Sequence, residues 1–149
     1  MAWFKHVASE IYFEETGSGE PVLLLPGFSD RVENHNALRE ALGRNYRVIT
    51  ADLPGSGRSL PQPRNYHPGY YLEDAQAFIA LLDHIDVSAA HILGFSDGGE
   101  VALLMAAIKP NAVRSVLTWG AQGSIIDPDG QKRTGMTLDV MESQIPIII

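Results

Sequence analysis

The chain has 149 residues, a length typical of one compact domain. It contains no cysteine, which excludes a disulfide scaffold, a cysteine-ligated zinc site, an iron–sulfur cluster and a thiol nucleophile. Eleven basic and eighteen acidic side chains give a net charge of −7, and Lys132-Arg133 is the longest basic cluster. We therefore expect neither nucleic acid nor a membrane surface as a partner, and small neutral or cationic ligands fit better.

The overall hydrophobicity is that of a soluble globular protein, with 45% hydrophobic and 19% charged residues. The longest apolar run, residues 101–108, is far shorter than the roughly 20 residues that cross a bilayer. The N-terminus lacks the charged start and apolar stretch of a secretory signal peptide. We expect a cytoplasmic protein.

The first part of the chain predicts strands. Residues 3–7 and 11–15 are separated by Ala8-Ser9-Glu10 and closed by Gly17-Ser18-Gly19, which indicates an antiparallel hairpin. Residues 22–25 are continuously apolar and end at a Pro-Gly pair, as expected for a strand buried on both faces of a parallel sheet. Three further segments have a similar character: residues 46–51, 91–93 and 113–118.

Helical patterns lie between these strands. Residues 36–42 end at a glycine, and residues 71–85 carry apolar side chains at a spacing near 3.6. Residues 97–109 are apolar on nearly every side, which places that helix deep against the sheet. The alternation predicts an α/β fold with right-handed crossovers. After Trp119 we expect a loop, a short helix at residues 137–143 and an isoleucine-rich end at 145–149.

The most informative motif is Gly94-Phe95-Ser96-Asp97-Gly98-Gly99, between a predicted buried strand and an apolar helix. That context is typical of a nucleophile elbow, a sharp turn that exposes a strained serine. Glycines two residues before and after Ser96 leave room for the bend. The alternative is a serine that caps the following helix. We favour Ser96 as a catalytic nucleophile.

A serine that attacks a carbonyl also needs donors for the developing oxyanion. The amide of Asp97, at the start of the predicted helix, can supply one. The second is expected after an earlier strand, where Leu25-Pro26-Gly27 precedes Phe28, whose amide is our candidate. The alternative is a simple Pro-Gly turn that ends the strand.

From residue 11 to about 122 the chain resembles the α/β-hydrolase family. The matching segments are Leu25-Pro26-Gly27-Phe28, Asp52-Leu53-Pro54-Gly55-Ser56-Gly57-Arg58-Ser59 and Gly94 to Gly99. Within the family, Ser96-Asp97-Gly98-Gly99 and Thr118-Trp119-Gly120-Ala121 look most like the valacyclovir hydrolase or biphenyl-hydrolase-like branch. The resemblance implies a three-layer sandwich, a serine esterase or amidase acting on a small ester or amide, and a role for Asp97 in binding a substrate amino group.

The chain departs from the family in its triad. The family order is serine, then acid, then histidine, whereas all five histidines precede Ser96. We therefore expect the triad histidine and acid to be absent from the chain, with His35, after the Pro-Gly turn, the least implausible substitute. Asp127 and Asp129 follow the last predicted strand, but Asp127-Pro128-Asp129-Gly130 is more simply a turn.

The resemblance thus implies a truncated α/β-hydrolase fold of about six strands. We expect residues 1–122 to form the N-terminal half of the hydrolase core, and residues 123–149 to be a linker with the start of a cap or a swapped C-terminal segment. The last strand would be an exposed apolar edge, so we expect a homodimer formed through that edge or through exchanged C-terminal segments. We expect no cofactor and no metal. Two functions remain: a serine hydrolase, or a non-catalytic half-hydrolase scaffold.

Overall fold

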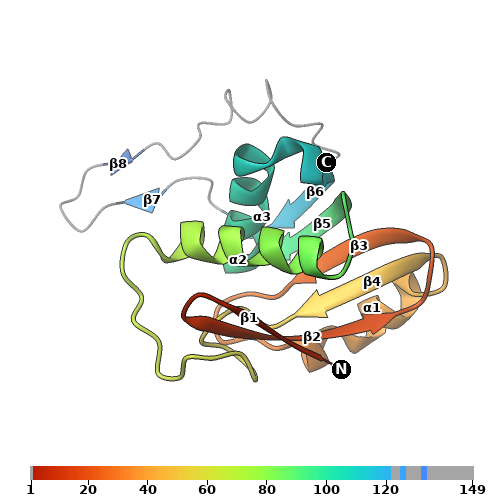
Figure 1. Ribbon diagram of the computed structural model, residues 1–149, viewed down its shortest axis with the longest axis horizontal. Helices are drawn as coiled ribbons and strands as arrows, with labels where there is room; N and C mark the ends of the chain where they lie inside the picture. Colours follow the sequence, from red (N-terminus) through yellow and green to blue (C-terminus); the bar gives the residue numbers. More distant parts are fainter. Residues whose placement is uncertain (1, 122–124, 127–131, 134–149) are drawn as a thin grey trace.

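The computed structural model describes residues 2–121, 125–126 and 132–133. A six-stranded sheet runs through it in the spatial order β1-β2-β4-β3-β5-β6 (Figure 1). The strands are β1 (Ala2–His6), β2 (Ser9–Thr16), β3 (Glu20–Leu25), β4 (Tyr46–Ala51), β5 (Ala90–Phe95) and β6 (Val113–Trp119). β1 pairs antiparallel with β2, β2 pairs antiparallel with β4, and the remaining pairs are parallel. The predicted hairpin followed by parallel strands is confirmed.

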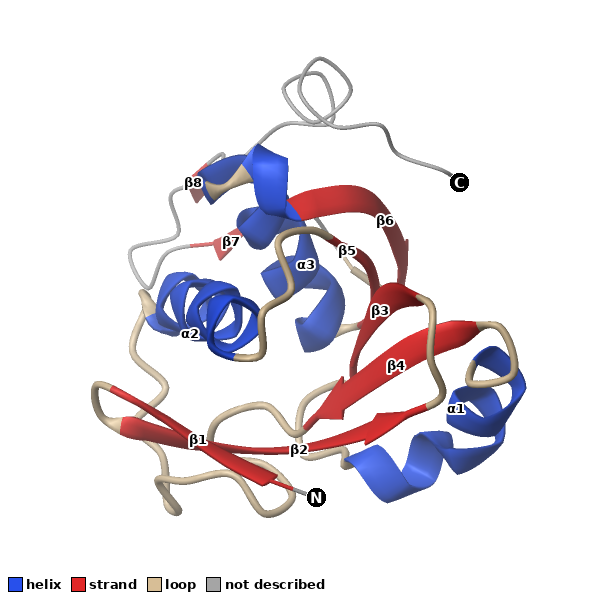
Figure 2. Ribbon diagram, turned by 45° about the vertical axis from the view of Figure 1, so that its right-hand side comes forward, coloured by secondary structure: helices blue, strands red, loops and turns tan. Residues whose placement is uncertain are grey.

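Helices cover both faces of the sheet, which gives three layers (Figure 2). α2 (Tyr70–His84) and α3 (Asp97–Ile108) lie on one face, and α1 (Asn36–Leu42) lies on the other. Two short 3₁₀ turns, η1 (Val32–His35) and η2 (Pro110–Ala112), precede α1 and β6. The three helices have nearly the predicted bounds, and seven of the twelve residues of α3 are buried, as its all-round apolar pattern predicts.

The core sits between the sheet and the α2–α3 pair. β3 lies between β4 and β5, so both edges of its backbone are paired, and its last four residues are all buried. Phe78 and Leu81 of α2 and Met105 of α3 are fully buried and belong to the same core cluster as Leu23 and Leu25 of β3. The continuously apolar sequence of β3 is explained by its position, because β3 lies in the middle of a sheet that is covered on both faces.

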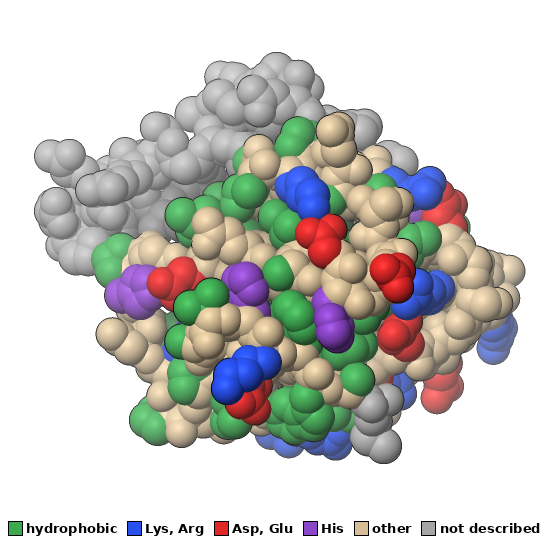
Figure 3. All heavy atoms as spheres, in the orientation of Figure 1, with side chains coloured by type: hydrophobic (Ala, Val, Ile, Leu, Met, Phe, Trp, Pro, Cys, Tyr) green, Lys and Arg blue, Asp and Glu red, His purple; other side chains and the backbone are tan. Residues whose placement is uncertain are grey.

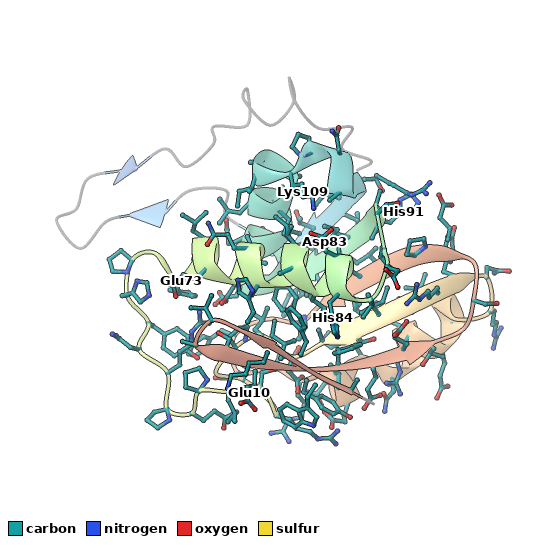
Figure 4. The ribbon with its side chains drawn as sticks, viewed as in Figure 1. Glu10, Glu73, Asp83, His84, His91 and Lys109 are labelled. Atoms are coloured by element: carbon teal, nitrogen blue, oxygen red, sulfur yellow. The ribbon has the colours of Figure 1, made fainter. Side chains whose placement is uncertain are left out.

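Two contacts tie α2 to its neighbours (Figure 4). Nζ of Lys109, just after α3, lies 2.8 Å from a carboxylate oxygen of Asp83 in α2. The ring of His84, the last residue of α2, packs at a tilt against the ring of Phe4 in β1, with the centroids 4.9 Å apart. These contacts hold the C-terminal end of α2 to both α3 and the leading hairpin.

Many charges on the surface lie in pairs. On the face seen in Figure 3, Lys and Arg side chains lie beside Asp and Glu side chains and do not gather in one basic patch. Examples are Lys5 with Glu10 and Arg47 with Glu15. Within the described ranges, every helix is too short or too polar to cross a membrane.

One element differs from expectation. The segment after Trp119, predicted as a loop, contains two short antiparallel strands, β7 (Ile125–Ile126) and β8 (Lys132–Arg133). Two-residue strands carry no periodicity that a sequence pattern could show. The predicted helix at residues 137–143, the isoleucine-rich residues 145–149, and Asp127 and Asp129 lie outside the described residues.

Candidate active site

The candidate site lies where β3 and β5 end side by side. These neighbours are parallel, and their register pairs Leu25 with Gly94. Both strands therefore end at the same edge of the sheet, so the turn at Gly27, after β3, lies next to the turn at Ser96, after β5. The carboxyl ends of adjacent parallel strands are the usual place for ligand sites in α/β folds.

Ser96 connects β5 to α3 in a conformation rarely adopted by a residue with a side chain, with φ 50° and ψ −116°. A capping serine instead has an extended backbone and bonds a helix amide through its hydroxyl. Within the described part of the chain, the Ser96 side chain makes no such capping bond. The backbone holds the turn: the Ser96 amide donates to the carbonyl of Trp119 at 2.9 Å, and the Ser96 carbonyl accepts from the Gly99 amide at 2.8 Å.

The glycines around Ser96 are required by close backbone approach. A Cβ on Gly94 would lie 2.3 Å from the carbonyl oxygen of Gly98. A Cβ on Gly98 would lie 2.4 Å from the carbonyl oxygen of Leu25 and 2.5 Å from that of Pro26. The start of α3 thus packs directly on the end of β3, which only residues without a side chain permit.

The turn after β3 reaches Ser96 itself. A Cβ on Gly27 would lie 3.3 Å from Cβ of Ser96. Phe28 follows, and its ring is mostly exposed. The next residue, Ser29, has φ 56°, and its amide donates to Oγ of Ser56 at 3.2 Å. The structure therefore brings together the two turns that carry the candidate oxyanion donors.

The carboxylate of Asp97 is held by two tyrosines that sequence reasoning missed. Tyr71 donates its hydroxyl to Oδ1 at 2.9 Å, and Tyr70 donates to Oδ2 at 3.2 Å. Burial raises the pKa of Tyr70 to about 12 and also raises the pKa of Tyr71. Both hydroxyls therefore keep their protons at neutral pH and remain donors. The one signal in the sequence is the aromatic pair at the start of α2.

Asp52 organises the loops behind the site. Its fully buried carboxylate accepts the amide of Val32 and the amide of Arg58, each at 2.8 Å. Burial raises the pKa of Asp52, although these bonds oppose the rise. Oγ of Ser59 donates to the Asp52 carbonyl at 2.8 Å. One side chain thus fastens both the segment after the Gly27 turn and its own glycine-rich loop.

The histidines bond elsewhere. Nε2 of His35 lies 2.6 Å from Oδ2 of Asp30. Partial burial acts to raise the pKa of Asp30, but hydrogen bonds from Asn34 and His35 outweigh it and lower that pKa overall. On β5, His91 bonds the hydroxyl of Ser115 at 2.6 Å (Figure 4). The candidate acids Asp127 and Asp129 lie outside the described residues.

This strand–serine–helix geometry on a parallel sheet agrees with the sequence comparisons. The alpha/beta hydrolase fold family matches residues 20–136, and the chain belongs to that family. It is similar to the human (Homo sapiens) serine hydrolase BPHL, with 29% identity over 130 residues, which are 85% of this chain and 45% of that protein.

Two further proteins also match this chain over only part of their own length. A dihydrolipoyllysine-residue acetyltransferase component of the acetoin cleaving system of Pseudomonas putida is 38% identical over 70% of this chain and 28% of its own. The structure of a thermophilic esterase from Thermogutta terrifontis superposes with a TM-score of 0.73 at 30% identity, over 81% of this chain and 44% of that one. The chain thus spans less than half the length of these relatives.

Proposed function

We propose that the protein is a serine hydrolase of small carboxylic esters or amides in which Ser96 is the nucleophile. The observation that carries this proposal is the backbone of Ser96, strained at φ 50° between β5 and α3 and free of a capping role in the described structure. Backbone strain of this kind persists at functional sites, where it aims a side chain. Membership of the hydrolase family supports the assignment.

The chemistry follows the usual acyl transfer. Oγ of Ser96 forms a bond to the carbonyl carbon, and the carbonyl π electrons move onto its oxygen, which the amides of Phe28 and Asp97 stabilise. Collapse of this intermediate breaks the bond to the leaving alcohol or amine, which takes up the proton that a general base removed from Ser96. Water then attacks the acyl-serine, releases the acid and restores the hydroxyl.

Asp97 has a second proposed role in binding a substrate amino group. Each carboxylate oxygen has two acceptor sites, and the bonds from Tyr70 and Tyr71 use only one on each oxygen. An ammonium group can therefore bond Asp97 while the tyrosines hold it in place.

The general base is the missing part of this proposal. All five histidines precede Ser96 in the sequence, and the described hydrogen bonds of His35, His67 and His91 run to groups other than Ser96. We propose that the base and the triad acid are absent from this chain or supplied by a partner chain. Without a base, oxyanion stabilisation and binding still leave roughly 10³- to 10⁴-fold catalysis over water in well-studied serine hydrolases, so slow turnover is expected.

Covalent labelling tests the nucleophile. A fluorophosphonate probe should form one adduct per chain at Ser96, located by peptide mass spectrometry, and Ser96→Ala should remove at least about nine-tenths of it, because the strained serine is the one aimed at an oxyanion site. Ser88→Ala, at an exposed serine before β5 and so at the opposite end of that strand from Ser96, is the control and should label normally. An adduct at another residue, or one that persists in Ser96→Ala, would overturn the proposal.

A second function, a non-catalytic scaffold, is favoured by one observation: the described histidine contacts run to groups other than Ser96. It predicts that p-nitrophenyl acetate cleavage is equal in the native chain and in Ser96→Ala, because surface nucleophiles would then account for it. A several-fold drop in Ser96→Ala would exclude it.

We also propose that the chain forms a homodimer through β6. This strand is the edge of the described sheet, and Leu117 on it is 44% exposed. A groove of about 400 Å³, lined mainly by apolar side chains that include Val22, Leu93 and Leu117, opens beside it. Exposed apolar edges of this kind pair with other chains.

Sedimentation at low micromolar concentration should therefore show a dimer, and Leu117→Asp should weaken it at least about tenfold, because a charge would be buried in an apolar interface. The matched control is Val7→Asp, at the exposed β1–β2 turn, which should remain dimeric. A clean monomer for the native chain would contradict the proposal.

A further inference from the structure

Next to Ser96 lies a continuous row of aromatic rings, which we call the aromatic wall: Phe28, Tyr66 and Tyr70. The rings of Phe28 and Tyr66 meet edge to face, with centroids 5.2 Å apart, and those of Tyr66 and Tyr70 do the same at 5.2 Å. Phe28 follows the turn after β3, whereas Tyr66 belongs to the loop that leads into α2 (Figure 1). Segments far apart in sequence thus build one surface.

Both ends of the wall reach the Ser96 turn. At one end Phe28 follows Gly27, whose Cβ would lie 3.3 Å from Cβ of Ser96. At the other end Tyr70 bonds the carboxylate of Asp97, the residue after Ser96. The wall therefore borders the place where an acyl group bonded to Ser96 would lie.

The wall is exposed although it is built from large apolar rings. Phe28 is 56% exposed and Tyr66 is 40% exposed. Single exposed aromatic residues are common on protein surfaces, but a contiguous apolar patch beside a reactive group is typical of a binding site.

Two of the three rings, Tyr66 and Tyr70, are held in place by their neighbours. The guanidinium of Arg64 lies over the rings of Tyr66 and Tyr70, 5.4 Å and 5.2 Å from their centroids. Arg64 is fixed in turn by two hydrogen bonds to the buried carboxylate of Asp74. Gly55 packs against the hydroxyl of Tyr66 so closely that a Cβ on Gly55 would lie 2.9 Å from the hydroxyl oxygen. Rings that are fixed before a ligand arrives bind it with little loss of side-chain entropy.

We propose that the aromatic wall binds a planar aromatic group of the substrate, so that the preferred substrates are aryl or arylalkyl esters and amides. This inference rests on the proposed function, in which Ser96 attacks the substrate carbonyl. Flat rings can pack edge to face or offset against Phe28 and Tyr66. A saturated ring of the same carbon number is puckered and lacks the ring quadrupole, so it forms these contacts less well.

A matched pair of probes tests the proposal. Fluorophosphonates that carry a benzyl or a cyclohexylmethyl group differ only in planarity and π character. Measured by intact mass, the benzyl probe should label the native chain about tenfold faster, because two ring contacts favour it. Tyr66→Leu keeps apolar bulk but removes one of the two ring contacts, so it should lower that ratio to about threefold. Leu72→Ala, at an exposed leucine outside the wall, should leave the ratio unchanged. An equal rate for both probes in the native chain would overturn the inference.

A reaction-free measurement separates this inference from the proposed function. Benzyl alcohol, titrated into the ¹⁵N-labelled protein, should shift the amide resonances of Phe28, Tyr66 and Tyr70 more than cyclohexylmethanol does. If benzyl alcohol causes these shifts but the probe does not label Ser96, the assignment of Ser96 as nucleophile is wrong and the aromatic site stands. If Ser96 is labelled but the benzyl probe is not preferred and these shifts are absent, the assignment of Ser96 as nucleophile stands and the aromatic site is wrong.

Discussion

Replacing Gly98 with alanine should destabilise the protein by about 3 kcal/mol, near the upper end of typical overpacking costs. The new Cβ would lie 2.4 Å from the Leu25 carbonyl oxygen and 2.5 Å from that of Pro26. Leu25 is the last residue of β3, the strand between β4 and β5, and Pro26 follows it directly, so these oxygens cannot move aside without disturbing the sheet. Urea unfolding followed by circular dichroism measures the loss.

The variant should also lose reactivity beyond its loss of stability. Relief of the contact would tilt the start of α3, and with it the turn at Ser96, away from Gly27. Gly69→Ala is the matched control: its φ is −92°, and the nearest atoms, at 3.3 Å, belong to the side chain of His67. It should cost less than about 1 kcal/mol. Equal losses for the two variants would refute the close-packing argument.

Replacing Arg64 with leucine should cost about 3 to 5 kcal/mol, which is typical when one partner of a buried ion pair is removed. The side chains of Arg64 and Asp74 are only 6% and 2% exposed. Without the guanidinium, the carboxylate of Asp74 would keep its charge in a site that water does not reach. The loss is measured by urea unfolding at pH 8.

The effect should depend on pH with a defined sign. Burial raises the pKa of Asp74 to about 6, although the bonds from Arg64 oppose the rise. The folded state therefore binds the proton more tightly than the unfolded state, whose pKa is about 3.9, so the Asp74 contribution to stability decreases as pH rises between about 4 and 6. Loss of Arg64 raises this pKa further, so Arg64→Leu should cost less at pH 5 than at pH 8.

Two comparisons check the mechanism. Adding Asp74→Asn to Arg64→Leu removes the buried charge and should recover much of the stability at pH 8. Arg114→Leu breaks the exposed pair with Glu20 and should cost under about 1 kcal/mol. If the cost of Arg64→Leu were independent of pH and not relieved by Asp74→Asn, lost packing rather than an unpaired charge would be the cause.

The fold could be predicted because its signals are local and strong. Residues 22–25 form an unbroken apolar run that ends at Pro-Gly, and residues 71–85 have a helical period, so β3 and α2 lie almost where they were predicted. The turn at Ser96 was found in the same way, because close packing demands glycines at fixed distances from the serine. The boundary between a hydrolase core and a further segment near residue 122 stays a prediction.

The rest of the candidate site depends on contacts between distant residues that no periodicity records. Tyr71 bonds Asp97, and Tyr66 meets Phe28, only because the fold brings α2 and the loop before it to the turns that follow β5 and β3. Asp52 likewise matches a family motif in sequence, but its bond to the Val32 amide needs the folded loops. Sequence patterns indicate which elements form, whereas side-chain partners across elements are determined by the tertiary structure.

The pairing of β3 with β5 has a consequence for synthesis of the chain. β3 and β4 are close in sequence and can pair as soon as both leave the ribosome, but Val22 has to wait for His91 before its second edge is covered. Until then an apolar parallel edge is open, and non-local parallel pairing of this kind is slow and prone to aggregation. The turn at Ser96 can form only when β5 closes that edge, so the nascent protein forms the strained Ser96 backbone and covers the open edge of β3 in the same late step.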